Sequence, residues 1–191
     1  VFEFGGFFGI GLSLMISLRT RFHSNYYSKI TSSTFAMIGT LFLWCFWPSF
    51  NTAAFPVDNG IRTNMVAINT YFCLIGSLMG TVFMSTILNN GKVNMQHILN
   101  ASICGGVLMG AGADLLADSF VAYIVGAVGG ILCCLSYACV DPILRRLCLY
   151  DMGGITHLFA ISGMHGGWLS AVYRARYLNG GGYQIAGTFI S

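Results

Sequence analysis

The sequence predicts an all-α polytopic membrane protein, and three observations lead to this fold class. The 191 residues are 55% hydrophobic and only 8% charged, whereas a soluble domain carries about a quarter charged residues. Apolar runs recur along the chain, and several have the length of about 20 residues that a membrane-spanning helix needs. Such runs are too long for barrel strands, the other structure that satisfies its backbone in lipid. The lipid bilayer is therefore the first partner that the sequence predicts.

The first three helices are predicted from apolar runs that end at polar loops. The run at 4–18 is rich in glycine and ends at a basic loop. The run at 35–54 is long enough to cross a bilayer, and a turn that contains Pro and Gly separates it from the run at 66–88. The sequence Asn-Asn-Gly-Lys at 89–92 is typical of a turn and ends the third helix.

Three more complete helices are predicted further along the chain. The segment 96–116 is more polar at its start than the others, and the run at 120–140 is closed by Asp-Pro. A short amphipathic connector is expected at 143–151, and the run at 154–172 is the sixth helix. Residues 184–191 are expected to begin a seventh helix.

Loop charges predict the orientation in the membrane. The alternate loops 19–33, 89–95 and 141–153 contain six Lys and Arg residues, and the opposite loops contain three. Because cytoplasmic loops carry an excess of Lys and Arg, the first set is expected to be cytoplasmic.

Small residues recur four positions apart in nearly every segment. This spacing allows helix backbones to approach closely, which predicts a compact bundle and is compatible with a narrow wall around a pore. The pairs are Gly5/Gly9, Gly76/Gly80, Gly106/Gly110, Gly126/Gly130 and Gly163/Gly167.

Several other kinds of protein are disfavoured by the composition. Most of the seven cysteines lie in apolar runs without a C-x-x-C pair, so we expect packing residues rather than disulfides or a metal site. The net charge of +3 is spread over loops and predicts no nucleic-acid partner. Neither a nucleophile–base–orienter set nor a nucleotide-binding loop is present, so we expect no enzyme and no cofactor.

The block Trp47-Pro48-Ser49-Phe50-Asn51, with the apolar run before it, closely resembles the sixth helix of the Rh branch of the ammonium transporter superfamily. The resemblance implies an ammonium-transporter-like bundle of eleven helices, in which two inverted five-helix repeats surround a pore and monomers form trimers. Further blocks resemble the family in order, at 4–9, 67–71, 97–101, 105–107, 151–163 and 182–185.

This mapping implies a single, partial membrane domain over 1–191. Residues 1–18 correspond to the end of helix five, 35–172 to the second repeat, and 184–191 to the start of helix eleven. Since inverted repeats form their substrate path between the two halves, the first repeat must come from the same or another polypeptide. We therefore expect an internal piece of a larger protein, in the plasma membrane by resemblance or in an organelle membrane as the alternative.

The resemblance also assigns candidate residues to the pore. Phe50 matches the gate phenylalanine of helix six, and Trp47 and Asn51 flank it in the same block. The family's two pore histidines share a hydrogen bond, and Phe2 and Phe159 stand at their positions. Imidazoles relay protons near neutral pH, whereas phenylalanine cannot.

The remaining polar residues of these blocks are not expected to replace the lost histidines. On an α-helix His157 is turned about 200° and His165 roughly 240° from Phe159, so both should point elsewhere. His97 is expected to be an interfacial histidine at a helix start. Asp151 is expected to stabilise the start of a helix rather than to act as a catalyst.

Two functions of different classes follow. The first is a degenerate Rh-type channel for ammonia, ammonium or another small neutral gas, as a homotrimer or in a larger complex. The second is a non-transporting scaffold subunit of a larger membrane assembly. The family blocks favour the first function, and the loss of both pore histidines favours the second.

Overall fold

The computed structural model describes residues 1–19, 30–53, 60–116, 118–147, 149, 151 and 153–177. This part of the chain forms helices joined by turns, which confirms the all-α prediction. In chain order they are α1 (Phe2–Arg19), α2 (Ile30–Thr52), α3 (Gly60–Leu88), α4 (Met95–Ala101), α5 (Cys104–Met109), α6 (Ser119–Cys139), α7 (Asp141–Arg146), the π-helix η1 (Thr156–Ile161) and α8 (Ser162–Tyr177).

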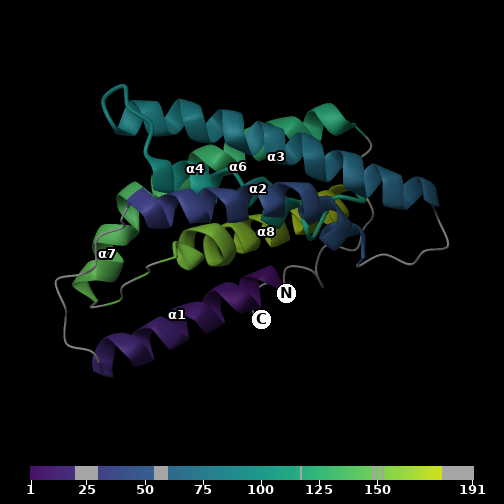
Figure 1. Cartoon of the computed structure of the whole chain (residues 1–191). Coiled ribbons are helices and arrows are strands. Elements are labelled where there is room, and N and C mark those ends of the chain that lie inside the picture. Colours follow the sequence, from purple (N-terminus) through teal and green to yellow (C-terminus); the bar gives the residue numbers. More distant parts are fainter. Residues whose placement is uncertain are drawn as a thin grey trace.

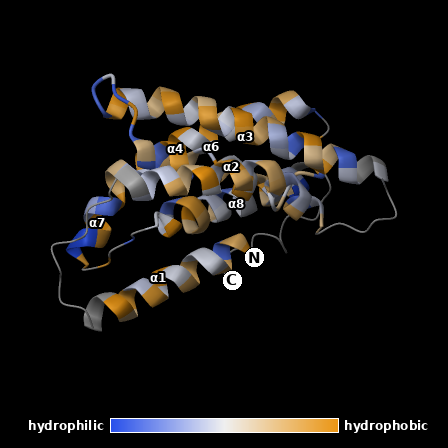
Figure 2. Cartoon of the chain, viewed as in Figure 1, coloured by the Kyte–Doolittle hydropathy of each residue, from blue (hydrophilic) through white to orange (hydrophobic). Residues whose placement is uncertain are grey.

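Three helical stretches of the described residues are long and apolar enough to cross a membrane, at Ser32–Thr52, Thr63–Leu88 and Ser119–Arg146. The long helices lie side by side, with α3 at one edge of the bundle and α1 at the other, beyond α8 (Figure 1). Apolar residues cover much of the outward surface of these helices, while polar residues gather at α7 and at the turn after α3 (Figure 2). A bilayer is the solvent that this surface requires.

The helices α3 and α6 pack most closely, and glycines make this contact possible. A Cβ atom at Gly76 would collide with the backbone of Tyr123, and one at Gly126 would collide with the backbone of Cys73. Gly80 and Gly130 meet backbone of the opposite helix in the same way. The two glycine pairs of this interface therefore pack as predicted.

The glycine pair in α1 behaves differently from the prediction. A Cβ atom at Gly9 would meet Ile155, but one at Gly5 would have no contact with the described residues within 4 Å. Gly6 instead lies against the backbone of Ala160 in η1, so the close approach is displaced by one residue.

The prediction of one helix over 96–116 is wrong, because the structure divides this segment. Helix α4 ends at Ala101 and α5 begins at Cys104. The break is held by Ser77 of α3, whose hydroxyl donates to the Ala101 carbonyl at 2.5 Å and accepts the Gly105 amide at 3.2 Å. A side chain from a neighbouring helix thus satisfies backbone groups that lipid could not.

After α5 the chain continues in turns rather than as a helix. The amide of Asn69 in α3 donates to the Ala113 carbonyl at 2.9 Å and to the Leu116 carbonyl at 2.8 Å. The hydroxyl of Ser170 in α8 donates to the Ala111 carbonyl at 2.8 Å. These bonds replace those that a continuous helix would have made.

The connector and the sixth predicted helix also differ in detail. Helix α7 begins at Asp141 and includes Pro142 in its first turn, a position where proline is tolerated because no helical partner is needed there. The segment 154–172 is a π-helix followed by α8, which extends to Tyr177. The expected seventh helix at 184–191 lies outside the described residues.

The described parts of the loops that the charge pattern places together lie at one end of the bundle. The turn after α3 and helix α7, which carry Lys92, Arg145 and Arg146, both lie at this end, as does the end of α1 (Figures 1 and 2). This arrangement agrees with alternating crossings. Which side of the membrane this end faces stays a prediction.

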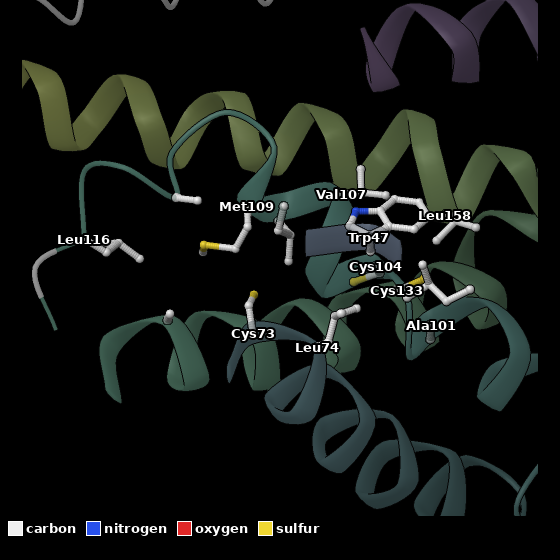
Figure 3. Close-up of a cluster of buried hydrophobic side chains, with 14 of the residues drawn as sticks. Trp47, Cys73, Leu74, Ala101, Cys104, Val107, Met109, Leu116, Cys133 and Leu158 are labelled. Atoms are coloured by element: carbon white, nitrogen blue, oxygen red, sulfur yellow. The ribbon is translucent and has the colours of Figure 1, made fainter. Parts of the chain in front are cut away.

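A buried apolar core lies where α2, α3, α5, α6 and η1 meet. Figure 3 shows Trp47 beside Val107 and Leu158, with the thiols of Cys104 and Cys133 in the same cluster. These two cysteines and Cys73 are fully buried free thiols. They act as the packing residues that the sequence predicts.

Candidate functional site

Four aromatic rings from three separate segments gather at the edge of this core. The ring of Phe2 in α1 lies 5.5 Å from the indole of Trp47, 5.3 Å from Phe50 and 6.2 Å from Phe159, measured between centroids. The indole of Trp47 lies 6.5 Å from Phe50 and 6.3 Å from Phe159. These separations are typical of favourable aromatic pairs. We refer to Phe2, Trp47, Phe50 and Phe159 as the aromatic cluster.

Helix α2 supplies two members of the cluster and one polar neighbour. Trp47, Phe50 and Asn51 are three and four residues apart, so they share one side of the helix. Trp47 is 5% exposed and Asn51 is 4% exposed, whereas Phe50 is 58% exposed. Phe50 therefore forms the open rim of the cluster, and Trp47 forms its buried base.

Two glycines of the divided segment 96–116 leave space for two of the rings. The indole of Trp47 occupies the space that a Cβ atom at Gly106 would need, and the ring of Phe2 occupies the corresponding space at Gly110. The Gly106/Gly110 pair therefore differs from the predicted contact between helix backbones. Aromatic rings fill the space that these glycines leave.

Asn51 ties the base of the cluster to two other helices. Its side-chain amide donates to the Gly106 carbonyl at 3.1 Å and to the Thr70 hydroxyl at 3.2 Å. The Thr70 hydroxyl in turn donates to the Val66 carbonyl at 2.7 Å. The amide of Asn51 therefore joins α2 to α3 and α5, and its part in lining a pore stays a prediction.

Two polar atoms beside the cluster are buried without a hydrogen-bond partner in the described part of the chain. They are the indole nitrogen of Trp47 and the side-chain oxygen of Asn51. One is a donor and the other is an acceptor, and they belong to residues one helical turn apart. The base of the cluster thus contains one donor and one acceptor without a partner among the described residues, beside the hydrogen bonds of the Asn51 amide.

The histidines that the sequence discounts have their contacts elsewhere. The ring of His157 lies 4.0 Å from that of Tyr137, and its Nδ1 lies 2.9 Å from the Ser136 hydroxyl. The Nδ1 of His165 lies 2.7 Å from a backbone carbonyl in the preceding turn. The angle of about 100° per residue assumed for His157 holds for an α-helix, whereas this stretch is a π-helix.

Sequence reasoning named His97 and His157 separately but missed the polar contacts next to the core that link them through Tyr137. The ring of Tyr137 contacts two imidazoles, with centroid distances of 4.0 Å to His157 and 5.1 Å to His97. The Nδ1 of His97 lies 3.0 Å from the Ser85 hydroxyl, and Asn100 donates to the Tyr137 hydroxyl at 2.8 Å. The available signal was the presence of these polar side chains inside apolar runs.

Asp151 occupies the structural position that the sequence predicts. Its two carboxylate oxygens accept the backbone amides of Ile155 at 2.9 Å and Thr156 at 2.6 Å. A carboxylate at this position satisfies amides that lack a helical partner and is favoured by the helix dipole. Asp151 therefore fixes the start of the segment that carries Phe159.

The chemistry available to the aromatic cluster follows from its composition. Four aromatic rings form an apolar surface that disfavours hydrated ions, and none of them can take up a proton near neutral pH. The cluster can therefore restrict passage, but it cannot relay protons.

The ammonium transporter family model matches this chain over residues 1–191. Among its relatives, "Ammonium transporter Rh type C" of Gasterosteus aculeatus is 40% identical over 177 residues, which is 90% of this chain and 36% of that protein. "Ammonium transporter Rh type A" of Rattus norvegicus is 37% identical and covers 90% of this chain and 39% of that protein. The relatives are named as transporters, which supports the prediction that the chain is not an enzyme.

Solved structures show the same fold. The Rh50 protein of Nitrosomonas europaea, whose description refers to conduction by the Rhesus protein family of channels, superimposes with a TM-score of 0.76 at 26% identity. That comparison covers 95% of this chain and 48% of the Rh50 chain. A structure named "Sensor Amt Protein" has a TM-score of 0.78 at 17% identity, which shows the fold alone.

The chain spans about half the length of these solved structures and 36% to 39% of the two relatives. The match to the family model nevertheless covers the whole chain, and the membrane-length helices agree with it. This chain is an integral, multi-pass membrane protein of Rh type, and it belongs to the ammonium transporter family.

Proposed function

We propose that this chain is the second-repeat half of an Rh-type ammonium channel in which ammonium-dependent conduction is weakened or lost. The observation that carries the proposal is the aromatic cluster. Positions 2, 50 and 159, which were assigned to the pore from separate blocks of sequence, place their rings within 6.5 Å of one another or of Trp47. Residues that line one path are expected to converge in this way.

The chemistry of the cluster favours a neutral species over a cation. A desolvated ammonium ion is costly in an apolar path unless a group nearby accepts its proton. The resemblance places paired histidines at positions 2 and 159, and this chain has Phe2 and Phe159 there. Neutral ammonia or another small neutral gas is therefore the species that this path would admit, with Phe50 as its gate.

The domain boundaries fit a protein whose other half completes the path. In this proposal 1–18 is the end of helix five, 35–172 is the second repeat and 184–191 begins helix eleven. Phe50 and the outer face of α2 are exposed, as expected where a first repeat would pack. That repeat belongs to the same or another polypeptide, and the complete protein forms a trimer or a larger complex in the plasma membrane.

The second candidate is a scaffold subunit that keeps the fold without transport. The observation that favours it is the same pair, Phe2 and Phe159, whose stacked rings close one side of the cluster at 6.2 Å. If no solute passes the cluster, the retained fold would serve assembly alone.

Reconstitution of the full-length protein distinguishes these candidates. Liposomes with a pH-sensitive dye inside are exposed to an ammonium gradient, and the current across a supported membrane is measured in parallel. We expect a rise in internal pH faster than in protein-free liposomes, without a saturable ammonium-linked current. A fast, saturable current would refute the loss of conduction, and a rise no faster than in protein-free liposomes would favour the scaffold.

A matched set of variants tests the role of the two phenylalanines. The double variant Phe2→His with Phe159→His is expected to gain a saturable ammonium-linked current that the parent lacks. Each single variant should gain none, because one imidazole lacks its partner. A double variant that behaves like the parent would contradict the assignment of these positions to the path.

A further inference from the structure

We propose that His157 is a positioning residue, which acts through its Nδ1 atom and Ser136 to hold η1 as a π-helix and so places Phe159 in the aromatic cluster. The relevance of this placement to conduction rests on the proposed function. The placement itself is a property of the fold and can be tested without measuring flux.

The hydrogen bonds of Ser136 determine how His157 is bound. The hydroxyl of Ser136 donates its single proton to the Cys133 carbonyl at 2.7 Å. Because the Ser136 proton is used in that bond, we assign the imidazole as the donor in the contact of 2.9 Å between that hydroxyl and Nδ1 of His157. This assigns the proton to Nδ1 and leaves Nε2 as a bare acceptor, which is buried without a partner among the described residues.

The backbone of His157 is held as firmly as its ring. Its carbonyl accepts the Ser162 hydroxyl at 3.0 Å and the Cys133 thiol at 3.6 Å. In an α-helix this carbonyl would accept a backbone amide four residues later, so side chains of α6 and α8 take part in satisfying it here. His157 is 1% exposed, and its ring lies in a tilted arrangement against that of Tyr137 in α6, with 4.0 Å between the centroids.

The π-helical geometry of η1 sets the direction of the Phe159 side chain. A π-helix bonds each carbonyl to an amide five residues later and needs more residues per turn than an α-helix, so a change to α geometry would rotate Phe159 relative to α8. The ring of Phe159 lies within 25° of the planes of both Phe2 and Trp47, and a rotation would end this stacking. The next residue, Ala160, lies against Gly6 of α1, which leaves the segment little room to adjust.

The two nitrogens of His157 give a sharp test, because asparagine and glutamine each imitate one of them. His157→Asn keeps a donor near the position of Nδ1, whereas His157→Gln places its amide near Nε2. If the Ser136 bond holds the segment, asparagine should preserve the placement of Phe159 and glutamine should not. If the imidazole acted as a proton relay through both nitrogens, neither variant would replace it.

The placement of residue 159 is measured by fluorine NMR on the full-length protein. A fluorinated phenylalanine is introduced at position 159, where the rings of Phe2 and Trp47 shift its resonance. We expect His157→Asn to keep the parent resonance. His157→Gln and Ser136→Ala should shift it by more than its line width toward the value of the free amino acid.

A control variant and a flux measurement separate the possible outcomes. Ser170→Ala removes another buried serine bond, to the Ala111 carbonyl, and should leave the resonance unchanged. The proposal is overturned if Ser136→Ala leaves the resonance unchanged, or if His157→Asn shifts it as far as His157→Gln. If the His157→Gln variant does not fold, the resonance of the Ser136→Ala variant alone tests the proposal. Flux through the parent protein tests the proposed function separately, since a shifted resonance does not depend on transport.

Discussion

Replacing Gly106 by alanine should disturb the base of the aromatic cluster directly. A Cβ atom at this position would collide with three ring atoms of the Trp47 indole. The indole is confined by the rings of Phe2 at 5.5 Å and Phe159 at 6.3 Å, so it has no open space to enter. Overpacking of this kind costs about 1–3 kcal/mol in a well-packed core.

A second effect adds to this cost in the same direction. The Gly106 carbonyl accepts the Asn51 amide at 3.1 Å, and a backbone shift that relieves the collision would stretch this bond. A buried hydrogen bond of this type contributes about 1 kcal/mol. We therefore expect the Gly106→Ala variant to lose about 2–4 kcal/mol of unfolding free energy in total.

Gly112→Ala provides a matched control in the same segment. Gly112 is buried as well, but a Cβ atom there would lie 3.6 Å from the Ser170 Cβ atom, which is ordinary contact. This variant should change stability by no more than about 0.5 kcal/mol. Both variants are compared by denaturant unfolding in detergent, with tryptophan fluorescence as the probe. Equal stability of the two, with unchanged emission, would refute the close packing at Gly106.

Three further predictions concern single hydrogen bonds or ion pairs. Asn51→Leu leaves the Gly106 carbonyl without its donor and should cost about 1–3 kcal/mol in denaturant unfolding; an unchanged midpoint would contradict this. Asp151→Ala removes the carboxylate that caps the Ile155 amide, and should cost about 0.5–2 kcal/mol and speed hydrogen exchange at that amide. Arg145→Ala breaks an exposed ion pair of 2.9 Å in α7 and should change stability by less than about 1 kcal/mol, so a larger loss in thermal unfolding would be unexpected.

The sequence predicts those features that depend on local pattern. Apolar length predicts the positions of the membrane helices, and the glycine spacing predicts close helix packing, because both are properties of one segment read by itself. The structure then shows which helices meet, since the glycines of α3 lie against α6. The resemblance of the block at 47–51 assigns Trp47 and Phe50 together to a candidate pore site. In the structure the indole of Trp47 lies 6.3 Å from the ring of Phe159. Phe159 comes more than a hundred residues later in the sequence, so this contact is not a local pattern.

The features that the sequence does not predict depend on side chains from other helices. The break after α4 exists because Ser77 of α3 satisfies the backbone there, and nothing within 96–116 records this. The π-helix is held by bonds to His157 from α6 and α8, so a period of 3.6 residues could not reveal it. Gly6 rather than Gly5 faces η1, since the rotation of α1 is set by its partner.

Under the proposed function, Phe2 and Phe159 are one change from the paired histidines that the resemblance places at these positions, rather than two separate changes. A single buried imidazole without a partner leaves a polar group unsatisfied, whereas replacing both partners of a hydrogen bond by apolar groups of similar shape can be nearly neutral. Phe2 and Phe159 lie within 6.2 Å of each other and both stack on Trp47, so their rings are mutually consistent as an apolar pair. Under the proposed function, the fold can therefore remain stable without a proton-accepting pair at these positions. Stability of this chain and ammonium-dependent conduction are then separate properties, and the retained packing of Trp47 and Asn51 argues only for the first.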